Sequence, residues 1–307
     1  MSIVLCPGQG AQKVGMGKDL AERYPKARET FAAIDDALGV KLSRIMWEGP
    51  ESDLTLTHNA QPAILAHSAA VLAVVGERLG DVVLGAGHSL GEYSAYVAAG
   101  ALTAPDAARL VRRRGELMYE AGTARPGAMA AVLGLGTAEV EAACSVASLG
   151  GGIAVPANLN APDQTVISGD PEAVERAGAE CRERGAKRVV ALKVSGAFHS
   201  PLMAPAVDGL RSALAEVEFT DPAFPVIANA SAEPIATGAD ARRLLVDQLT
   251  APVRWVASMQ AAAALQPAAR YIETGPGTVL SGLLKRIVPG AESLAAGTAD
   301  EVERFLS

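Results

Sequence analysis

The strongest fold signal in the chain is the stretch Val82-Val83-Leu84-Gly85-Ala86-Gly87-His88-Ser89-Leu90-Gly91. Val82–Ala86 is a short apolar run that predicts a buried strand, and Leu90–Ala99 has the pattern of a helix. The residues between them match G-x-S-x-G and centre on Ser89. A chain that turns sharply at a serine brings the flanking residues into collision unless they are glycines. The stretch therefore predicts a strand, a tight turn and a helix in an α/β protein.

Ser89 stands where such a turn exposes a hydroxyl group at the start of a helix. Backbone N–H groups and the helix dipole at that point stabilise a negatively charged oxygen. We therefore expect Ser89 to be a catalytic nucleophile. The alternative is a plain strand–helix turn in which the serine only caps the helix.

The rest of the chain also alternates short apolar runs with helical patterns, which is typical of an α/β protein with a mostly parallel sheet. A chain of 307 residues is long enough for one large core and a smaller subdomain. Further strands are expected at Ile3–Cys6, Val226–Asn229 and Tyr271–Glu273, and further helices at Asn59–Leu79, Ala104–Glu120 and Ala251–Leu265.

Residues 126–195 show a different order of elements. Strands are expected at Met129–Leu133, Ile153–Pro156, Thr165–Ser168 and Arg188–Val194, and helices at Thr137–Val146 and Pro171–Arg184. The order β-α-β-β-α-β is that of a ferredoxin-like subdomain. We therefore expect a large catalytic domain made of residues 1–125 and 196–307, with a ferredoxin-like subdomain of residues 126–195 inserted into it.

A serine hydroxyl needs a general base, and the chain has four histidines. His88 is next to Ser89, but adjacent side chains at such a turn point apart, so we expect it to pack. His58 and His67 flank or lie in a helical stretch without other chemistry. His199 lies in the loop that returns from the inserted subdomain, and such loops line clefts. It is the candidate base, with a loop histidine of purely structural role as the alternative.

One charged residue of the expected helix Ala104–Glu120 falls on its apolar stripe. The stripe consists of Ala107, Leu110, Val111, Leu117 and Met118. Arg114 lies inside it, whereas Arg112 and Arg113 point away from its centre. A buried guanidinium needs an anionic partner. That partner is either an internal carboxylate or a substrate carboxylate bound by two parallel hydrogen bonds, and the position leaves both open.

Composition and missing motifs exclude several classes of function. The formal net charge of −7 argues against general nucleic-acid binding, which needs a basic surface. No uninterrupted apolar stretch approaches the roughly 18 to 20 residues needed to cross a bilayer, and we expect no secretion signal before the first strand. The cysteines are Cys6, Cys144 and Cys181, without CxxC spacing, and they predict a reduced, cytoplasmic protein. The lack of a spanning stretch predicts that the protein does not bind membranes.

No cofactor motif is complete. Gly8-Gln9-Gly10 follows the first expected strand, but Lys13 stands where G-x-G-x-x-G requires its third glycine. No P-loop, HExxH or clustered metal-ligand spacing occurs. We therefore expect neither a metal nor a bound cofactor. A glutamine between two glycines suits a loop that presents its backbone N–H group to an active site.

Together these segments resemble the malonyl-CoA:acyl carrier protein transacylases over nearly the whole chain. The similar blocks are Pro7-Gly8-Gln9-Gly10, Gln61-Pro62-Ala63, Gly87-His88-Ser89-Leu90-Gly91-Glu92, Arg114-Gly115, Ala197-Phe198-His199-Ser200, Gln248-Leu249-Thr250-Ala251-Pro252-Val253-Arg254-Trp255 and Gly275-Pro276-Gly277. Ordered blocks of this kind are far more specific than any single motif. One mild departure is Cys6, where Phe is frequent, and it affects packing only.

The resemblance implies a hydrolase-like α/β fold with a ferredoxin-like insert. It also implies a ping-pong transfer of the malonyl group from malonyl-CoA to the phosphopantetheine thiol of acyl carrier protein, for fatty-acid or polyketide synthesis. In this scheme Ser89 carries the malonyl group and His199 relays the proton. The thioester of coenzyme A is a substrate, so no cofactor is implied.

The resemblance also implies roles for residues around the nucleophile. The N–H groups of Gln9 and Leu90 would form the oxyanion hole, and the main-chain carbonyl of Gln248, rather than an aspartate, would orient His199. Substrate binding is assigned to Arg114, which clamps the malonyl carboxylate, and to Gln61, Phe198 and Asn160. The ring of Phe198 resembles malonyl-selective members because it leaves little space for a 2-methyl branch.

Acyl carrier proteins are acidic, so an acidic enzyme must offer them a local positive surface. A basic cluster lies at the end of the second expected helix of the insert and the start of its last strand: Arg182, Arg184, Lys187 and Arg188. We expect Lys187 and Arg188 to dock the carrier, with a solvated charge run as the alternative and Lys285 and Arg286 as the next candidates.

The nearest rival is a serine hydrolase, such as a thioesterase or a lipase-like enzyme. It would share Ser89 and His199, but its histidine usually lies near the C-terminus and is held by an acid. Here a long segment follows His199, and no partner acid stands out. A catalytically inert carrier-docking module is a third possibility, and the intact set of Ser89, His199 and Arg114 argues against it.

Overall fold

The central sheet of the computed structural model, which describes residues 1–307, is built from the short apolar runs of the sequence. Its strands are β1 (Ser2–Cys6), β2 (Val82–Gly87), β7 (Val226–Ile227), β8 (Pro234–Ile235), β9 (Arg270–Thr274) and β10 (Ser293–Ala296). They lie in the order β10-β9-β1-β2-β7-β8. All neighbours are parallel except β7 and β8, which are antiparallel. The expected α/β class with a mostly parallel sheet is confirmed.

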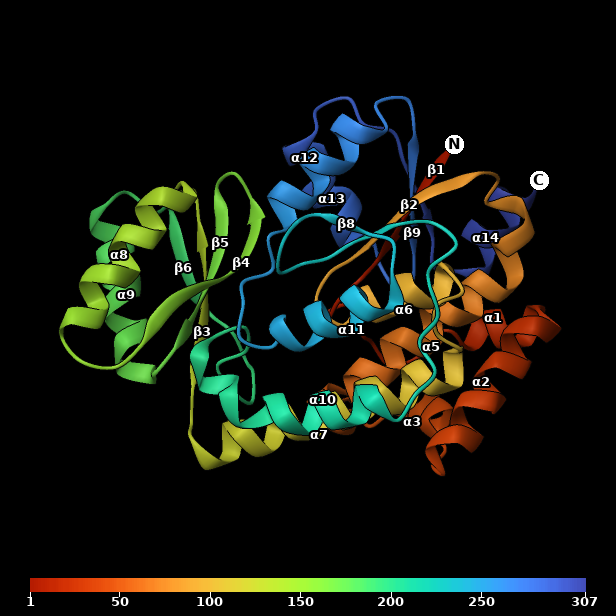
Figure 1. Ribbon diagram of the computed structural model, residues 1–307, viewed down its shortest axis with the longest axis horizontal. Helices are drawn as coiled ribbons and strands as arrows, with labels where there is room; N and C mark the ends of the chain where they lie inside the picture. The colour runs from red at the N-terminus through yellow and green to blue at the C-terminus, as the bar shows by residue number, and fades with distance from the viewer.

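Helices cover both faces of this sheet (Figure 1). They are α1 (Lys18–Arg23), α2 (Pro25–Leu38), α3 (Leu42–Glu48), α4 (Glu51–Thr55), α5 (Thr57–Val75), the 3-10 turn η1 (Gly76–Arg78), α6 (Gly91–Ala98), α7 (Ala104–Ala124), the 3-10 turn η2 (Pro201–Ala206), α10 (Val207–Ala215), α11 (Gly238–Asp247), α12 (Trp255–Leu265), α13 (Val279–Ile287) and α14 (Ala299–Leu306). Side chains alternate along β1. Val4 and Cys6 therefore join the core formed with α2, α5, α6 and α7, while Ile3 and Leu5 join the core formed with α12 and α13.

Residues 128–191 form a second sheet at one end of the molecule (Figure 1). The elements are β3 (Ala128–Leu133), α8 (Thr137–Leu149), β4 (Ala154–Ala161), β5 (Gln164–Gly169), α9 (Pro171–Glu183) and β6 (Arg188–Ala191). The strands lie in the order β4-β5-β3-β6, and every neighbouring pair is antiparallel. Both helices pack on this sheet through a separate apolar cluster that includes Val132, Val140 and Cys181. The element order is the one that the sequence predicts.

Two element boundaries differ from the sequence prediction for a physical reason. The helix expected from Ala251 begins only at Trp255, because Val253 pairs with β4: its N–H donates to Ala157 O at 2.8 Å and its carbonyl accepts from Leu159 at 2.9 Å. The strand expected to run to Val194 ends at Ala191, and residues 192–194 line a cavity instead. Contacts between distant segments therefore overrule the local pattern at both positions.

The segment Thr57–Arg78 is long and apolar enough, by length and composition, to cross a membrane, and 78% of its apolar window is buried inside the protein. It is not an uninterrupted apolar stretch, because polar residues such as Asn59, Gln61 and His67 fall within it. It includes α5, whose residues Ile64, Leu65 and Val71 are fully buried in the main core. Such burial is typical of a central helix of a globular fold.

Candidate active site

The turn between β2 and α6 is held by close backbone contacts. A Cβ atom on Gly87 would lie 2.0 Å from the carbonyl of Gly91, and one on Gly91 would lie 2.1 Å from the carbonyl oxygen of Cys6. Those neighbours are backbone atoms that cannot move aside, so both positions require glycine. Between them Ser89 has a φ of 53°, a conformation that is strained for a residue with a side chain. The turn thus places the serine hydroxyl at the start of α6, as the sequence predicts.

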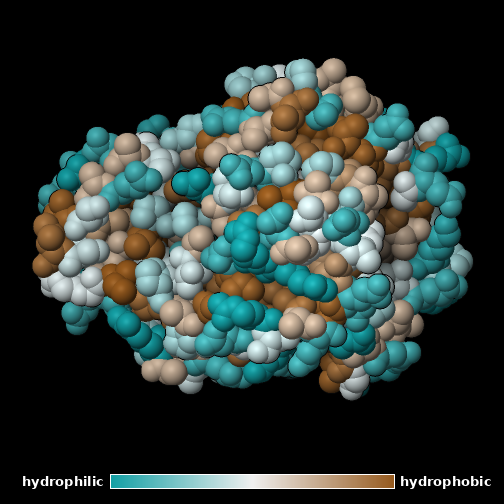
Figure 2. Space-filling view, in the orientation of Figure 1, coloured by the Kyte–Doolittle hydropathy of each residue, from teal (hydrophilic) through white to brown (hydrophobic).

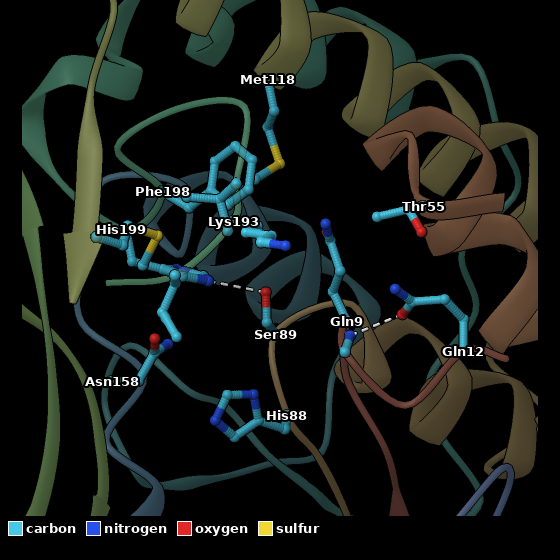
Figure 3. A pocket seen from close by; sticks show the side chains of 14 residues that line it. Gln9, Gln12, Thr55, His88, Ser89, Met118, Asn158, Lys193, Phe198 and His199 are labelled. Carbon is cyan, nitrogen blue, oxygen red and sulfur yellow. Dashed lines mark hydrogen bonds between the residues drawn. The ribbon is translucent and has the colours of Figure 1, made fainter. Parts of the chain in front are cut away.

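His199 lies beside Ser89. The Ser89 Oγ and His199 Nε2 atoms are 2.8 Å apart (Figure 3). Nδ1 of His199 lies 2.9 Å from the main-chain oxygen of Gln248. A carbonyl oxygen can only accept, so Nδ1 carries the hydrogen and Nε2 is free to accept a proton from the serine. Burial, with the positive charge of Arg114, lowers the pKa of His199 to about 3. The imidazole is therefore neutral near pH 7, as a general base must be.

No other histidine forms a hydrogen bond with the Ser89 hydroxyl. His88 Nε2 lies 2.8 Å from Asn160 Oδ1, and the ring packs against Trp255 with a centroid distance of 5.5 Å. His67 Nε2 lies 2.7 Å from the carbonyl oxygen of Gly297. Asn160, which the sequence analysis assigned to substrate binding, is thus engaged with His88 and does not line the cavity around Ser89. The asparagine that lines this cavity is Asn158, which the sequence analysis did not single out.

Arg114 is buried, with 1% of its surface exposed, and reaches the nucleophile. Its Nη1 donates to Gln61 Oε1 at 2.6 Å, and its Nη2 donates to Gln248 Oε1 at 2.9 Å and to Ser89 Oγ at 3.0 Å. It forms no salt bridge, in contrast to Arg112 and Arg113, which pair with Glu116. Burial lowers the pKa of Arg114. The guanidinium next to Ser89 therefore lacks a directly bonded carboxylate.

Two residues that the sequence analysis did not assign to the site complete the network. The fully buried Glu92 accepts through Oε2 from the N–H of Asn229 at 2.9 Å and from Gln248 Nε2 at 2.7 Å. Asn229 also accepts from the N–H of Ser89 at 2.7 Å and donates to the carbonyl of Gly87 at 2.7 Å. The sequence contained one signal for Asn229. It is a polar residue just after the parallel strand β7, and α/β proteins place their binding sites at the carboxyl ends of such strands.

The backbone N–H groups of Gln9 and Leu90 have no acceptor within the protein. Gln9 follows β1 and lines the same cavity as Ser89, and its side chain donates to Thr57 Oγ1 at 3.3 Å. Leu90 directly follows Ser89 and is the N-cap residue of α6. Two unsatisfied donors beside a nucleophile are suited to bind a developing oxyanion.

A cavity of about 280 Å³ opens over Ser89 between the two sheets (Figure 3). Its lining comes from both parts of the chain: Gln9, Gly10, Gln12, Thr55, His88, Ser89, Met118, Met129, Asn158, Leu192, Lys193, Val194, Phe198 and His199. Phe198 therefore lies at the cavity, as expected. The cavity also contains a cation that the sequence analysis did not identify, Lys193. Lys187 and Arg188 are exposed at the opposite end of β6.

A second hollow, between α10 and α11, has an apolar floor flanked by hydrophilic side chains (Figure 2). Its lining includes Leu214, Val246 and three arginines. Arg211 and Arg243 are paired with carboxylates on their own helices, and Arg242 donates to the carbonyl of Val217 at 2.8 Å. Arg211 and Arg243 are thus already paired, and no nucleophile lies among the residues that line this hollow. The cavity over Ser89 is therefore the candidate active site.

Neither metal-ligand clusters nor thiols contribute to this cavity. No group of three or more His, Cys, Asp or Glu side chains is placed to hold a metal ion. Cys6, Cys144 and Cys181 are free and buried, and burial raises the pKa of the Cys6 thiol to about 12. The serine hydroxyl is thus the nucleophile that the cavity presents.

An activated serine, two free backbone donors and a buried guanidinium define the class of a serine acyl-transfer enzyme. The acyl transferase domain family matches residues 3–296. The chain is 44% identical over 299 residues to the malonyl CoA-acyl carrier protein transacylase of Bacillus subtilis, covering 97% of this chain and 94% of that protein. It therefore belongs to the malonyl CoA-acyl carrier protein transacylases of the acyl transferase family.

Solved structures agree with this assignment. An acyl carrier protein S-malonyltransferase from Vibrio cholerae is 42% identical, covers 98% of both chains and superposes with a TM-score of 0.94. A malonyl-transacylase solved in complex with a type II PKS acyl carrier protein is 41% identical, with a TM-score of 0.94 and coverage of 100% of this chain and 99% of that one.

Proposed function

We propose that this protein transfers the malonyl group of malonyl-CoA to the phosphopantetheine thiol of acyl carrier protein through a malonyl-serine intermediate on Ser89. The observation that carries this proposal is the position of Arg114. Its guanidinium is buried 3.0 Å from the nucleophile and has no directly bonded carboxylate. A desolvated cation at that point suits an acyl group that ends in a carboxylate.

The first half-reaction loads the enzyme. His199 Nε2 accepts the proton of the Ser89 hydroxyl, and Oγ attacks the thioester carbonyl carbon of malonyl-CoA. The N–H groups of Gln9 and Leu90 bind the oxyanion of the tetrahedral intermediate. The C–S bond then breaks, and the leaving thiolate takes the proton from His199. The main-chain carbonyl of Gln248 keeps the imidazole oriented throughout.

The second half-reaction reverses these steps with another thiol. The phosphopantetheine thiol of the carrier protein gives its proton to His199 and attacks the malonyl-serine ester. Collapse of the intermediate breaks the bond to Oγ, and His199 returns the proton to Ser89. The thioester supplies the activated acyl group in both directions, so this scheme needs neither a cofactor nor a metal.

Recognition of the malonyl group is assigned to side chains around the nucleophile. The planar guanidinium of Arg114 binds the carboxylate, and its Nη1 is oriented by a hydrogen bond to Gln61 Oε1 at 2.6 Å. Phe198 limits the space beside the acyl chain and thereby disfavours a 2-methyl branch. Asn160 acts through His88, to which it is bonded.

The same proposal covers the architecture and the location of the protein. Residues 1–125 and 196–307 form a hydrolase-like catalytic domain, and residues 126–195 form a ferredoxin-like subdomain. The strand order β4-β5-β3-β6 supports the second assignment. Three free, buried cysteines support a reducing, cytoplasmic location.

The carrier protein is proposed to dock at Lys187 and Arg188. Both side chains are exposed and form no salt bridge, whereas Arg184 pairs with Glu139 at 3.1 Å. β6 leads from these two residues toward Leu192 and Lys193 at the cavity. Arg286, one of the alternative candidates, is paired with Asp163 and is less available.

A single experiment tests the function. Brief exposure to malonyl-CoA without carrier protein should add one malonyl group, located on Ser89 by mass spectrometry. Addition of holo acyl carrier protein should remove that group and yield malonyl carrier protein. Rapid release of free malonate, with or without carrier protein, would instead identify a serine hydrolase.

A further inference from the structure

Arg114 and Glu92 are the two charged side chains in the buried network around Ser89, and they do not touch. Gln248 lies between them, with Oε1 accepting from Arg114 Nη2 at 2.9 Å and Nε2 donating to Glu92 Oε2 at 2.7 Å. An amide is suited to this place because a guanidinium only donates and an ionised carboxylate only accepts. One positive and one negative charge are thereby balanced inside the empty site.

The two oxygens of Glu92 are used unequally. Oε2 accepts both hydrogen bonds, from Asn229 and from Gln248, whereas the buried Oε1 has no partner. A buried ionised carboxylate normally accepts hydrogen bonds with both oxygens, and an oxygen without a partner is costly. A proton can therefore add to Oε1 without breaking either existing bond.

Binding of a malonyl group upsets this balance, because its carboxylate brings a second negative charge to Arg114. We propose that Glu92 is the counter-charge of Arg114 in the empty site and takes up a proton when the malonyl carboxylate binds. The proton comes from the solvent and adds to Oε1, and no bond to carbon changes in this step. The inference rests on the proposed function, and it adds a residue that sets the strength of carboxylate recognition.

The surroundings of Glu92 support such an exchange. Burial raises its pKa to about 7, although hydrogen bonds from Asn229 and Gln248 and the charge of Arg114 act in the opposite direction. Tyr93 and Tyr96, on the same helix, also interact with Glu92, and burial raises their pKa so that they stay neutral. The other elements packed on α6 are α5, α7, β1, β2 and β7. α7 contributes Arg114, and its remaining charged side chains pair with one another. The other four elements contain no Asp, Glu, Lys or Arg.

His199 does not compete for this proton. It contacts the network through the main-chain carbonyl of Gln248, and its pKa is about 3. Glu92 is thus the group in the network that is balanced between its two protonation states near pH 7. Protonation leaves the full charge of Arg114 to the substrate, so malonyl-CoA should bind more tightly as the pH falls through about 7.

Calorimetric titration of the Ser89→Ala variant with malonyl-CoA tests the proposal, because this variant binds without reacting. Measuring the heat in two buffers of different ionisation enthalpy gives the number of protons taken up. Half-ionised Glu92 predicts an uptake of about half a proton per malonyl-CoA at pH 7, and more at pH 8. Acetyl-CoA, which lacks the carboxylate, should bind without proton uptake.

Two double variants identify the group. Ser89→Ala with Glu92→Gln should show no proton uptake and should bind malonyl-CoA about tenfold more tightly at pH 8, because the competing charge is gone. The matched control combines Ser89→Ala with Glu273→Gln. Glu273 is also fully buried and accepts from two backbone N–H groups, at the start of α13. This control should keep the proton uptake.

The outcomes separate this inference from the function itself. Equal proton uptake with acetyl-CoA and malonyl-CoA, or uptake that persists in the Glu92→Gln variant, would overturn the role of Glu92. If the Glu92→Gln variant does not fold, proton uptake by Ser89→Ala with malonyl-CoA and with acetyl-CoA still tests the proposal. Failure of the wild-type enzyme to form a malonyl adduct on Ser89 would overturn the proposed function instead.

Discussion

The two halves of the candidate site are built in different ways. The reacting half, Ser89 and His199, is held by the backbone: both residues have positive φ angles, 53° and 56°, and a main-chain carbonyl orients the histidine. The recognition half, around Arg114, is held by side chains, since Gln61 and Gln248 accept from the guanidinium. Backbone atoms thus position one half, and hydrogen bonds between buried side chains position the other.

This difference teaches how the two halves should respond to substitution. Strained backbone and glycine contacts fix the position of the reacting atoms but do not sense the end of the acyl chain. In the proposed mechanism the guanidinium binds the malonyl carboxylate but takes no part in proton transfer. Changes in the reacting half should lower the transfer of every acyl group, and changes in the recognition half should alter which acyl group is transferred.

The largest effect is expected in the reacting half. Ser89→Ala should abolish the covalent adduct, and His199→Ala should slow acylation by about a thousandfold, because the neutral hydroxyl loses its base. Acylation by malonyl-CoA and by acetyl-CoA should fall by the same factor. Intact mass measured at short times after mixing gives both rates.

His67→Gln is the matched control for His199→Ala. It replaces a buried histidine that is bonded to the carbonyl of Gly297, away from Ser89, and should leave the acylation rates unchanged. An adduct that persists in Ser89→Ala, or that maps to a cysteine, would show that the nucleophile is misassigned.

The next effect separates the halves. Arg114→Ala should lower malonyl transfer by about a thousandfold but raise activity with acetyl-CoA relative to malonyl-CoA, because an unpaired buried guanidinium no longer opposes the uncharged acyl group. Arg114→Lys should recover little, since a point charge does not reproduce the planar fork. The ratio of kcat/KM for the two esters measures the change.

Arg112→Ala is the control on the same helix, because Arg112 is bonded to Glu116 and Asn59 outside the cavity. It should leave the ratio unchanged. Equal losses with both esters in Arg114→Ala would instead mark Arg114 as a structural residue, and the recognition half would not be separate.

The same contrast explains what the sequence could predict. The turn at Ser89 was predictable because strand, glycines and helix are contiguous, and the burial of Arg114 because helical spacing is a local property. The acceptors of the Arg114 hydrogen bonds could not be predicted from local patterns, since Gln61 and Gln248 lie 53 and 134 residues away from it in the sequence. The resemblance to a family pointed to both residues, but for substrate binding and for orienting His199 rather than as acceptors of Arg114.

Glu92 and Asn229 show more clearly what could not be predicted from the sequence. Glu92 lies in a short helix whose other residues give no sign that a carboxylate is buried there, and its partners come from residues 137 and 156 positions away. The start of α12 at Trp255 has the same cause, because Val253 pairs with a strand of the insert. Long-range polar contacts leave no periodic pattern in the sequence.

A smaller effect should appear in the pH dependence and would show how far the two halves are coupled. Burial and then the charge of Arg114 lower the pKa of His199 to about 3. Because the active form is the neutral imidazole, acylation by acetyl-CoA should stay constant as the pH falls from 8 to about 5. Arg114→Ala removes one of the causes that lower this pKa, so the acid limb of the acetylation rate should move to higher pH. An unchanged limb would mean that the charge of Arg114 does not reach His199.

The smallest effect is expected outside both halves, at the surface where the carrier protein is proposed to dock. Lys187→Glu combined with Arg188→Glu reverses two exposed, unpaired charges. The change should raise the KM for acyl carrier protein several-fold, because a rim charge mainly steers the encounter of acidic partner and enzyme. Loading of Ser89 from malonyl-CoA should not change, since neither residue lines the cavity. Arg28→Glu with Arg78→Glu is the matched control. It makes the same change in net charge at two exposed residues of α2 and η1, outside the second sheet. If both double variants raise the KM equally, overall charge rather than this surface governs docking. An unchanged KM in Lys187→Glu with Arg188→Glu would remove this surface from the proposal, and Lys285 with Arg286 would be tested next.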